Sequence, residues 1–237
     1  MTLAPPKDAV YYEQLYQTHD DPWAYGQAAE QAKYRLSLQT ARRWQPHPAR
    51  VLEVACSLGY LTEQLADYAD EVYAFDLSET AVRATHDRCR KHPRAAHVHV
   101  RQGDATQPGY PEAHFDVVFL QDVLLEIPET LRPAVLEQSL RLLTPGGVLV
   151  VNDYQQPSQQ EAYCQLVQSG GGRIVERIYF HDRGWFRLKS ALKAVRQTAP
   201  ARALLQSERV FRWLSGLSAR RGPEGSKHFG LVVQRNS

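Results

Sequence analysis

Sulfur-containing residues are scarce in this sequence of 237 residues, which has three cysteines and one methionine. Cys56, Cys89 and Cys164 are an odd number without CxxC spacing, so neither a disulfide framework nor a zinc site is indicated. His97 and His99 would share one face of a strand, but no third ligand stands at a useful spacing. We therefore expect no metal.

Long apolar runs are also absent. No segment approaches the ~20 apolar residues that cross a bilayer, and the sequence does not open with a basic segment followed by an apolar one. With 43% hydrophobic and 23% charged residues, the chain can bury one α/β core and a small appended element. We expect a single domain over residues 1–237, cytoplasmic, monomeric or homodimeric, with no membrane partner.

The sequence has little net charge, but that charge is unevenly distributed. Residues 173–237 contain 14 Lys and Arg against 4 Asp and Glu, whereas the whole chain carries +2. Apolar residues at helical spacing in this segment favour amphipathic helices with solvated basic faces. The alternative is that the basic residues attract an anionic substrate.

Glycine is missing where a cofactor-binding turn usually has it. An apolar strand at 51–54 runs into a turn whose small residues are Ala55, Ser57 and Gly59. These occupy the three glycine positions of the E-x-G-x-G-x-G pattern of class I S-adenosylmethionine (SAM) methyltransferases. The dinucleotide pattern would need a glycine at 60, where Tyr60 is too large for close helix–strand contact. We expect Ala55 and Ser57 to avoid positive φ, which strains a side chain.

Acidic residues follow the next two expected strands. Asp76 ends the strand at 71–75 and stands 17 residues after Gly59, close to the spacing at which a carboxylate binds ribose hydroxyls. Asp104 follows the strand at 98–101. The carboxyl ends of parallel strands share one edge of a sheet, so these acids should lie together.

From about residue 10 to 155 the chain resembles the small-molecule class I SAM methyltransferases. The segment Asp21-Pro22-Trp23, with the segment from Glu30 to Arg35, is similar to the NodS-like N-methyltransferases, which methylate an amino sugar of a chito-oligosaccharide. The resemblance implies a Rossmann-like α/β fold. Its seven-stranded sheet has the order 3-2-1-4-5-7-6, with the last strand antiparallel and helices on both faces.

The same resemblance implies a SAM site, with S-adenosylhomocysteine as product. Asp76 would bind the ribose and Asp104 the adenine amino group, while Tyr34 and Arg35 would hold the methionine carboxylate. The cofactor residues expected in total are Glu53, Ala55, Cys56, Ser57, Gly59, Asp76, Leu77, Asp104, Ala105, Gln121, Tyr34 and Arg35.

We divide the chain into three parts. Residues 1–45 form an aromatic-rich helical lid, in which Trp23 and Tyr25 contact the acceptor. Residues 46–155 form the SAM-binding half. Residues 156–237 form a C-terminal half with a helical insertion at 185–218 broken by Pro200. Tyr154, at the junction, is a third candidate acceptor contact.

Methyl transfer from a sulfonium is an in-line displacement that needs alignment, and a base where the acceptor carries a proton. Glu126 and His181 are the leading candidates for that base, because both should leave strands at the ligand crevice. The other candidates from the same loops are Asp122, Asp153, Tyr154 and Asp182.

The expected function is methylation of N or O on a small-molecule or oligosaccharide acceptor. An NAD(P)-dependent oxidoreductase is disfavoured by Tyr60 and by the lack of a Tyr-x-x-x-Lys pair. Nucleic acid is an unlikely partner, because Gln121-Asp122-Val123-Leu124 stands where base-modifying enzymes have Asn/Asp-Pro-Pro-Tyr/Phe. A non-catalytic SAM-fold binding protein stays open, because two glycines are replaced and no base is obvious.

Overall fold

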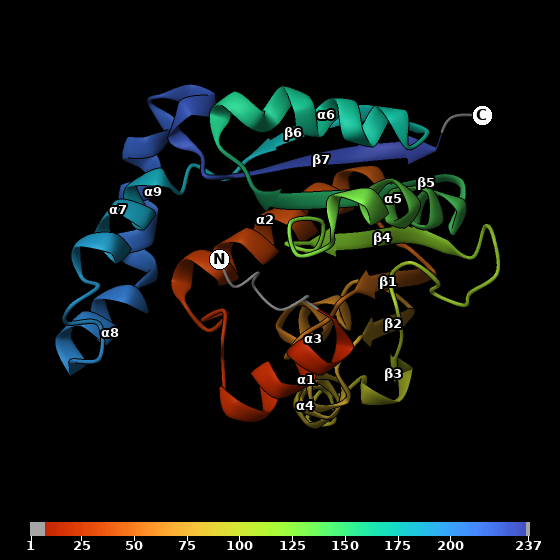
Figure 1. The fold of residues 1–237 in the computed structure, drawn as a ribbon, viewed down its shortest axis with the longest axis horizontal. Coiled ribbons are helices and arrows are strands. Elements are labelled where there is room, and N and C mark those ends of the chain that lie inside the picture. The colour runs from red at the N-terminus through yellow and green to blue at the C-terminus, as the bar shows by residue number, and fades with distance from the viewer. Residues whose placement is uncertain (1–7, 236–237) are drawn as a thin grey trace, which may run out of the picture.

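The computed structural model describes residues 8–235, so residues 1–7 of the expected lid and residues 236–237 lie outside the described residues. Within residues 8–235 one seven-stranded sheet runs through the molecule in the order β3-β2-β1-β4-β5-β7-β6 (Figure 1). Its strands are β1 (Arg50–Val54), β2 (Glu71–Asp76), β3 (Val98–Gln102), β4 (Phe115–Gln121), β5 (Leu143–Tyr154), β6 (Gly172–Tyr179) and β7 (His228–Arg235). The expected fold and strand order are confirmed.

Strand directions follow from how the chain returns to the sheet. β1 pairs in parallel with β2 and β4, and β4 with β5; α3 connects β1 to β2, and α5 connects β4 to β5. β7 is antiparallel to both β5 and β6 and enters the sheet between them. β4 lies near the centre and is buried along nearly its whole length, which explains its continuous apolar sequence.

Helices cover both faces of the sheet. They are α1 (Ala9–Thr18), α2 (Ala28–Trp44), α3 (Tyr60–Leu65), α4 (Glu79–Cys89), α5 (Arg132–Arg141), α6 (Gln160–Ser169), α7 (Arg183–Ala191), α8 (Ala199–Leu205) and α9 (Glu208–Ala219). Short 3₁₀ turns lie at η1 (Ala95–His97), η2 (Glu129–Leu131), η3 (Pro157–Gln159) and η4 (Gly222–Gly225). None of the helices within residues 8–235 is long and apolar enough to cross a bilayer.

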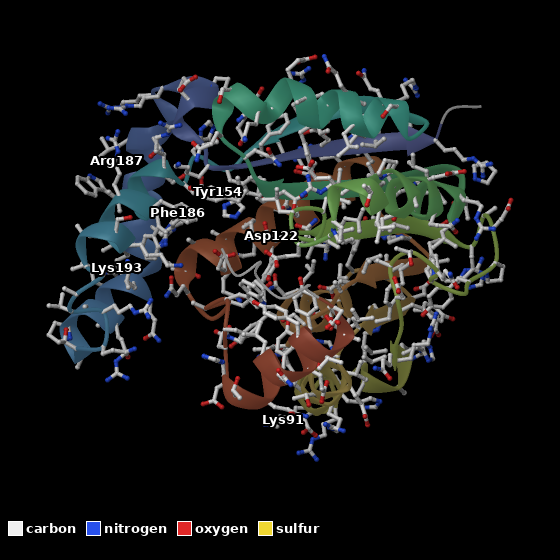
Figure 2. All side chains as sticks on the ribbon, viewed as in Figure 1. Lys91, Asp122, Tyr154, Phe186, Arg187 and Lys193 are labelled. Carbon is white, nitrogen blue, oxygen red and sulfur yellow. The ribbon has the colours of Figure 1, made fainter. Side chains whose placement is uncertain are left out.

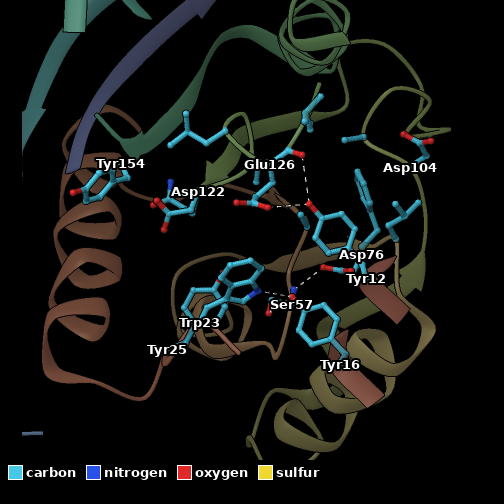
Figure 3. Close-up of a pocket in the computed structure, with 18 of the residues that line it drawn as sticks. Tyr12, Tyr16, Trp23, Tyr25, Ser57, Asp76, Asp104, Asp122, Glu126 and Tyr154 are labelled. Carbon is cyan, nitrogen blue, oxygen red and sulfur yellow. Dashed lines mark hydrogen bonds between the residues drawn. The ribbon is translucent and has the colours of Figure 1, made fainter. Parts of the chain in front are cut away.

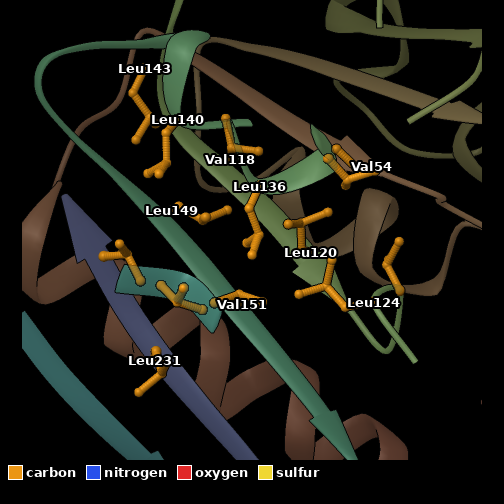
Figure 4. Packing of buried hydrophobic residues seen from close by; sticks show 14 of the residues in the cluster. Val54, Val118, Leu120, Leu124, Leu136, Leu140, Leu143, Leu149, Val151 and Leu231 are labelled. Atoms are coloured by element: carbon orange, nitrogen blue, oxygen red, sulfur yellow. The ribbon is translucent and has the colours of Figure 1, made fainter. Parts of the chain in front are cut away.

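Two apolar layers fix these helices to the sheet. On one face Leu136 and Leu140 of α5 pack with Val118, Leu120 and the other side chains of the cluster in Figure 4. On the other face α2 and α3 pack on alternate residues of the same strands. Because successive side chains of a strand point to opposite faces, β4 contributes to both layers.

The C-terminal helices form a third cluster at one end of the sheet, on the left of Figure 1. Trp185 of α7 is fully buried there against Phe211 of α9 and Ala29 of α2. The helical stretch is interrupted between α7 and α8 rather than at Pro200. Pro200 stands in the first turn of α8, where its missing N–H has no partner to lose.

Gly59 generates the first prediction. It has φ of 73°, and an added Cβ would lie 2.9 Å from the Thr85 Cα. Gly59→Ala should therefore lower the free energy of unfolding by about 1–3 kcal/mol, measured by urea titration. The matched control is Gly216→Ala in α9, where nothing lies within 4 Å of an added Cβ and alanine favours the helix. Equal stability of the two variants would contradict the steric argument.

Candidate active site

A cavity of about 660 Å³ opens at the carboxyl ends of β1, β2, β4 and β5 (Figure 3). The segment before α2 covers it, and the loop after β4 forms another wall. In Figure 3, Asp76 and Asp104 lie on one side of the cavity and Asp122 and Tyr154 on the other. The cavity therefore has two halves, which we call the Asp76 half and the Asp122 half.

Asp76 is the buried acid of the first half. Its carboxylate accepts the Ser57 N–H at 2.9 Å and the Ser78 N–H at 3.0 Å. Burial raises the pKa of Asp76 in spite of these bonds. Each carboxylate oxygen has a second lone pair, so the group can accept two further hydrogen bonds from a ligand in the cavity.

The turn that presents Ser57 has a strained backbone. Ala55 has φ of 57° and Ser57 has φ of 52°, in addition to Gly59. The sequence-based expectation that Ala55 and Ser57 avoid positive φ is therefore wrong. The left-handed conformation costs roughly 1–2 kcal/mol for a residue with a side chain. The alternating positive φ values explain why glycine suits these positions, and the strained turn is held by the Ser57–Asp76 bond.

The expected cofactor residues divide into two sets. Those that line the cavity are Ala55, Ser57, Asp76, Leu77, Asp104, Ala105 and Gln121. Glu53, Cys56 and Gly59 are not among the lining residues. The Glu53 carboxylate accepts the Thr62 hydroxyl at 2.5 Å, and burial raises its pKa to about 8. Burial also raises the pKa of the Cys56 thiol, which disfavours nucleophilic chemistry at this residue.

Tyr34 and Arg35 do not reach the cavity. Tyr34 is buried in the layer between α2 and the sheet. The Arg35 guanidinium is exposed and pairs with Glu208 of α9 at 2.9 Å. Lys33 lines the cavity instead. On a helix with 3.6 residues per turn, two positions correspond to a rotation of about 200° around the helix axis. Lys33 and Arg35 therefore lie on nearly opposite faces of α2.

α1 is fastened over the cavity by polar side chains. The Tyr12 hydroxyl donates to the Glu126 carboxylate at 3.1 Å, and the Tyr16 hydroxyl donates to Ser57 Oγ at 2.6 Å (Figure 3). The Trp23 indole in turn donates to Tyr16 at 3.3 Å. These bonds join α1 to two different loops of the sheet.

Glu13 provides a third attachment, at the start of α4. Its carboxylate accepts the Ser78 and Thr80 hydroxyls, each at 2.6 Å, and the Thr80 N–H at 3.1 Å. These bonds lower the pKa of Glu13 to about 2, so the carboxylate is ionised near neutral pH. A negative charge also suits the N-terminal end of a helix.

Asp122 is the centre of the second half. It directly follows β4 and has φ of 58°. Its carboxylate contacts the Lys33 ammonium and lies 3.4 Å from His228 Nε2. Lys33 also pairs with Glu30 at 2.5 Å, and His228 Nδ1 lies 2.5 Å from Asp182. Four segments distant in the sequence thus meet at one buried charge cluster.

The charges in this cluster support one another. Burial alone would raise the pKa of Asp122, but Lys33 and His228 hold it well below its usual range. Burial and Lys33 act to lower the pKa of His228, but Asp122 and Asp182 raise it to about 9. At neutral pH His228 is therefore a cation, and Asp122 is an ionised carboxylate at the cavity wall.

The two candidate bases are placed differently. Glu126 lines the cavity and accepts the hydrogen bond from Tyr12. His181 is not a lining residue. Its ring stacks on Tyr179, and its backbone N–H donates to the Ser226 hydroxyl at 2.9 Å. The expectation that His181 reaches the crevice is wrong, because the chain turns there at φ of 50° before α7 begins. Trp23, Tyr25 and Tyr154 line the cavity as expected.

Sequence reasoning missed several lining residues. Lys33 and Glu30 could have been found from the helical spacing of three that places them together. His228 and Phe186 carried no such signal, because they reach Asp122 and Tyr154 only through the sheet order and the packing of α7. Within residues 8–235 no group of His, Cys, Asp and Glu is arranged to hold a metal ion.

Comparison with known proteins gives a family match in the middle of the chain. Residues 51–147 match the model described as a methyltransferase domain. The chain is 28% identical over 163 residues to 2-phytyl-1,4-naphtoquinone methyltransferase of Synechococcus elongatus, covering 65% of this chain and 66% of that protein. It is 31% identical over 129 residues to the ubiquinone/menaquinone biosynthesis C-methyltransferase UbiE of Azotobacter vinelandii, covering 53% and 49%.

Two solved structures share the fold. The N-methyltransferase NodS of Bradyrhizobium japonicum, in complex with S-adenosyl-L-homocysteine, superimposes with a TM-score of 0.67 at 15% identity, covering 97% of this chain and 100% of that chain. The [4+2]-cyclase SpnF superimposes with 0.64 at 19% identity, covering 87% and 82%. The chain spans between 2% and 66% of the length of the first five curated relatives it matches.

The charge cluster generates a prediction on pH. Because the folded-state pKa of His228 is raised, its stabilising contribution should be complete below its ordinary pKa of about 6.5 and be lost as pH rises through about 9. The loss should amount to at most about 3 kcal/mol of unfolding free energy, measured by urea titration from pH 6 to 10. His228→Asn should lack this component.

The quantity to compare is the difference between wild type and variant. Glu53 and Asp153 have a pKa raised by burial to about 8 and about 7, so they also change stability over this range in both proteins. His86→Asn, at an exposed site on α4, is the matched control and should follow the wild type. If the His228→Asn curve runs parallel to wild type, the charge assignment at His228 is wrong.

Proposed function

We propose that this chain, which belongs to the class I SAM-dependent methyltransferases, methylates N or O of a small-molecule acceptor bound in the Asp122 half of the cavity. The observation that carries the proposal is the position of the half-buried Asp122 carboxylate, across the cavity from Asp76 (Figure 3). The proposal includes the segment up to residue 45 as a lid, supported by the bonds that Tyr12 and Tyr16 make across the cavity.

The residues of the Asp76 half suit SAM. The Asp76 carboxylate has lone pairs for two vicinal ribose hydroxyls, and Asp104 lies farther along the same side. The turn at 55–59 brings backbone close to the cavity, as a cofactor with a large flat surface requires. No arginine within residues 8–235 lines the cavity, and the cations that do, Lys33 and His228, belong to the charge cluster around Asp122.

The Asp122 half favours an acceptor that carries N–H or O–H. An ionised carboxylate accepts hydrogen bonds, and a nitrogen or oxygen nucleophile offers a donor at the reacting atom. Trp23, Tyr154 and Phe186 provide aromatic walls beside it. The relatives include C-methyltransferases, but a carbon nucleophile would leave Asp122 without a donor at the reacting atom.

The charge of the lining also bears on the acceptor. Within residues 173–235 no Lys or Arg lines the cavity, whereas the lining includes the acids Glu30, Asp122 and Glu126. This favours a neutral or cationic acceptor, such as an amine or a sugar, over the anionic acceptor considered from the sequence. An amine on a sugar, as the NodS-like resemblance implies, is one such acceptor.

Bound SAM would supply a methyl group on a good leaving group. The protein would then align the acceptor lone pair and exclude water, and alignment alone can contribute roughly 7–11 kcal/mol. Asp122 would orient the acceptor through its N–H or O–H. Lys33 and His228 would keep Asp122 ionised, so that it accepts the hydrogen bond without taking the proton, and the proton would leave through Glu126 to solvent.

Asp76→Ala should weaken SAM affinity by roughly tenfold to a few hundredfold, because a hydrogen bond to a charged group contributes about 1.5–3 kcal/mol. Calorimetry with SAM and S-adenosylhomocysteine measures this, with NAD as the ligand that should not bind. Asp87→Ala, at an exposed site on α4, is the matched control. Undiminished affinity in folded Asp76→Ala would remove Asp76 from the cofactor site.

Turnover is tested by screening amines, amino sugars and phenols with methyl-labelled SAM. For an acceptor that is methylated, Asp122→Asn should lower kcat by about 100-fold, because the lost carboxylate orients the acceptor. Thermal melting would show whether the variant stays folded. Methylation at carbon, or an unaffected kcat, would overturn the assignment of Asp122. SAM binding without any turnover would favour the non-catalytic alternative.

A further inference from the structure

The exposed basic residues of the C-terminal helices form a surface that the methyl-transfer site does not use. We define the α7–α9 surface by the exposed side chains Arg187, Lys193, Arg196, Arg202, Arg209, Arg212, Arg220 and Arg221. None of them forms an ion pair with another residue of the range 8–235; the only acid of α9, Glu208, pairs with Arg35. The excess positive charge of this segment is therefore not neutralised within the described chain.

Apolar side chains lie within this basic surface. The most exposed large apolar residue in residues 8–235 is Trp213, at 66%, and Leu217 and Val195 are 40% and 46% exposed. A single exposed apolar side chain is common on a protein surface, but several of them in one segment can mark an interaction site. Their exposure among unpaired cations is the observation that requires an explanation.

The outward face of α9 shows the arrangement clearly. Arg209, Trp213, Gly216 and Arg220 recur at spacings of three and four, so they form one stripe along the helix, with Leu217 beside it. Phe211 and Ser218, on the opposite side, are buried toward α7. The helix is thus apolar on its inner face and carries a cationic, aromatic stripe on its outer face.

This surface lies away from the cavity. Figure 2 shows Arg187 and Lys193 on the outer side of the C-terminal helices, whereas Asp122 and Tyr154 lie toward the middle of the molecule. The cavity lining contains none of the residues that define the α7–α9 surface. A small acceptor in the cavity therefore cannot account for the surface.

We propose that the α7–α9 surface binds the headgroup layer of an anionic membrane, with Trp213 and Leu217 entering the interface. Cations on a broad surface attract anionic headgroups, and tryptophan favours the boundary between headgroups and acyl chains. The basic residues are spread over three helices, and the exposed apolar residues line neither of the described cavities, which suits a fluid surface better than a folded acidic protein. The proposal revises the sequence-based expectation of no membrane partner.

Vesicle sedimentation tests the proposal on the full-length protein. It should sediment with vesicles of equal parts phosphatidylglycerol and phosphatidylcholine, and not with phosphatidylcholine alone. Raising the salt to about 0.5 M should release it, because screening shortens the range of surface charge. Each cation near an anionic surface contributes about a fivefold gain in affinity, so Arg209→Glu/Arg212→Glu should bind at least about 25-fold more weakly.

The matched control is Arg90→Glu/Lys91→Glu. These exposed residues stand at the end of α4, far from the C-terminal helices in Figure 2, and the variant reverses the same number of charges. It should bind vesicles at least about tenfold more tightly than Arg209→Glu/Arg212→Glu. Equal losses in both variants would reduce the effect to net charge and overturn a specific surface. Circular dichroism confirms that each variant is folded.

Trp213 gives a readout of insertion as well as binding. Its fluorescence should shift to shorter wavelength with anionic vesicles, and Trp213→Phe should lose that shift. Trp213→Ala should weaken sedimentation several-fold. The proposal is overturned if the protein does not sediment with anionic vesicles at low salt. It is also overturned if polyglutamate competes fully and Trp213→Ala has no effect, since an acidic protein partner would then fit better.

Discussion

The contact between Asp122 and its two cations, Lys33 and His228, holds the Asp122 half of the cavity together. Lys33 comes from α2, Asp122 from the end of β4, and His228 from the start of β7, so one carboxylate connects three segments. Removing one partner from a buried pair leaves an uncompensated charge, which typically costs 3–5 kcal/mol. The position of α2, and with it the segment before α2 that covers the cavity, therefore depends on this carboxylate.

A second constraint acts at the turn formed by residues 55–59. Ala55 and Ser57 hold left-handed backbone conformations that glycine would adopt without strain. The Ser57 N–H bond to Asp76 and the bonds of Tyr16 to Ser57 fix the strained turn in place. The carboxylate that we propose for the ribose thus also supports the backbone of this turn.

Charge is separated between the inside and the outside of the molecule. Among the charged residues that line the cavity the acids are in excess. They are Asp8, Glu30, Asp76, Asp104, Asp122 and Glu126, against the cations Lys33 and His228. The C-terminal helices carry unpaired cations on their outer faces. The proposed acceptor inside the cavity is neutral or cationic, which is compatible with the acids there. The proposed partner outside is anionic, which is opposite in charge to the C-terminal helices. Neither would therefore compete for the other's site.

Local pattern determined much of this protein. The alternation and apolar runs at 51–54, 71–76 and 115–121 place the strands, and the acids after them place Asp76 and Asp104 at one edge, because parallel strands end together. Tertiary structure decided the rest. Lys33 instead of Arg35 faces the cavity because of the rotation of α2, and His228 instead of His181 reaches Asp122 because β7 inserts beside β5. Contacts between residues so far apart depend on packing and leave no spacing in the sequence to read.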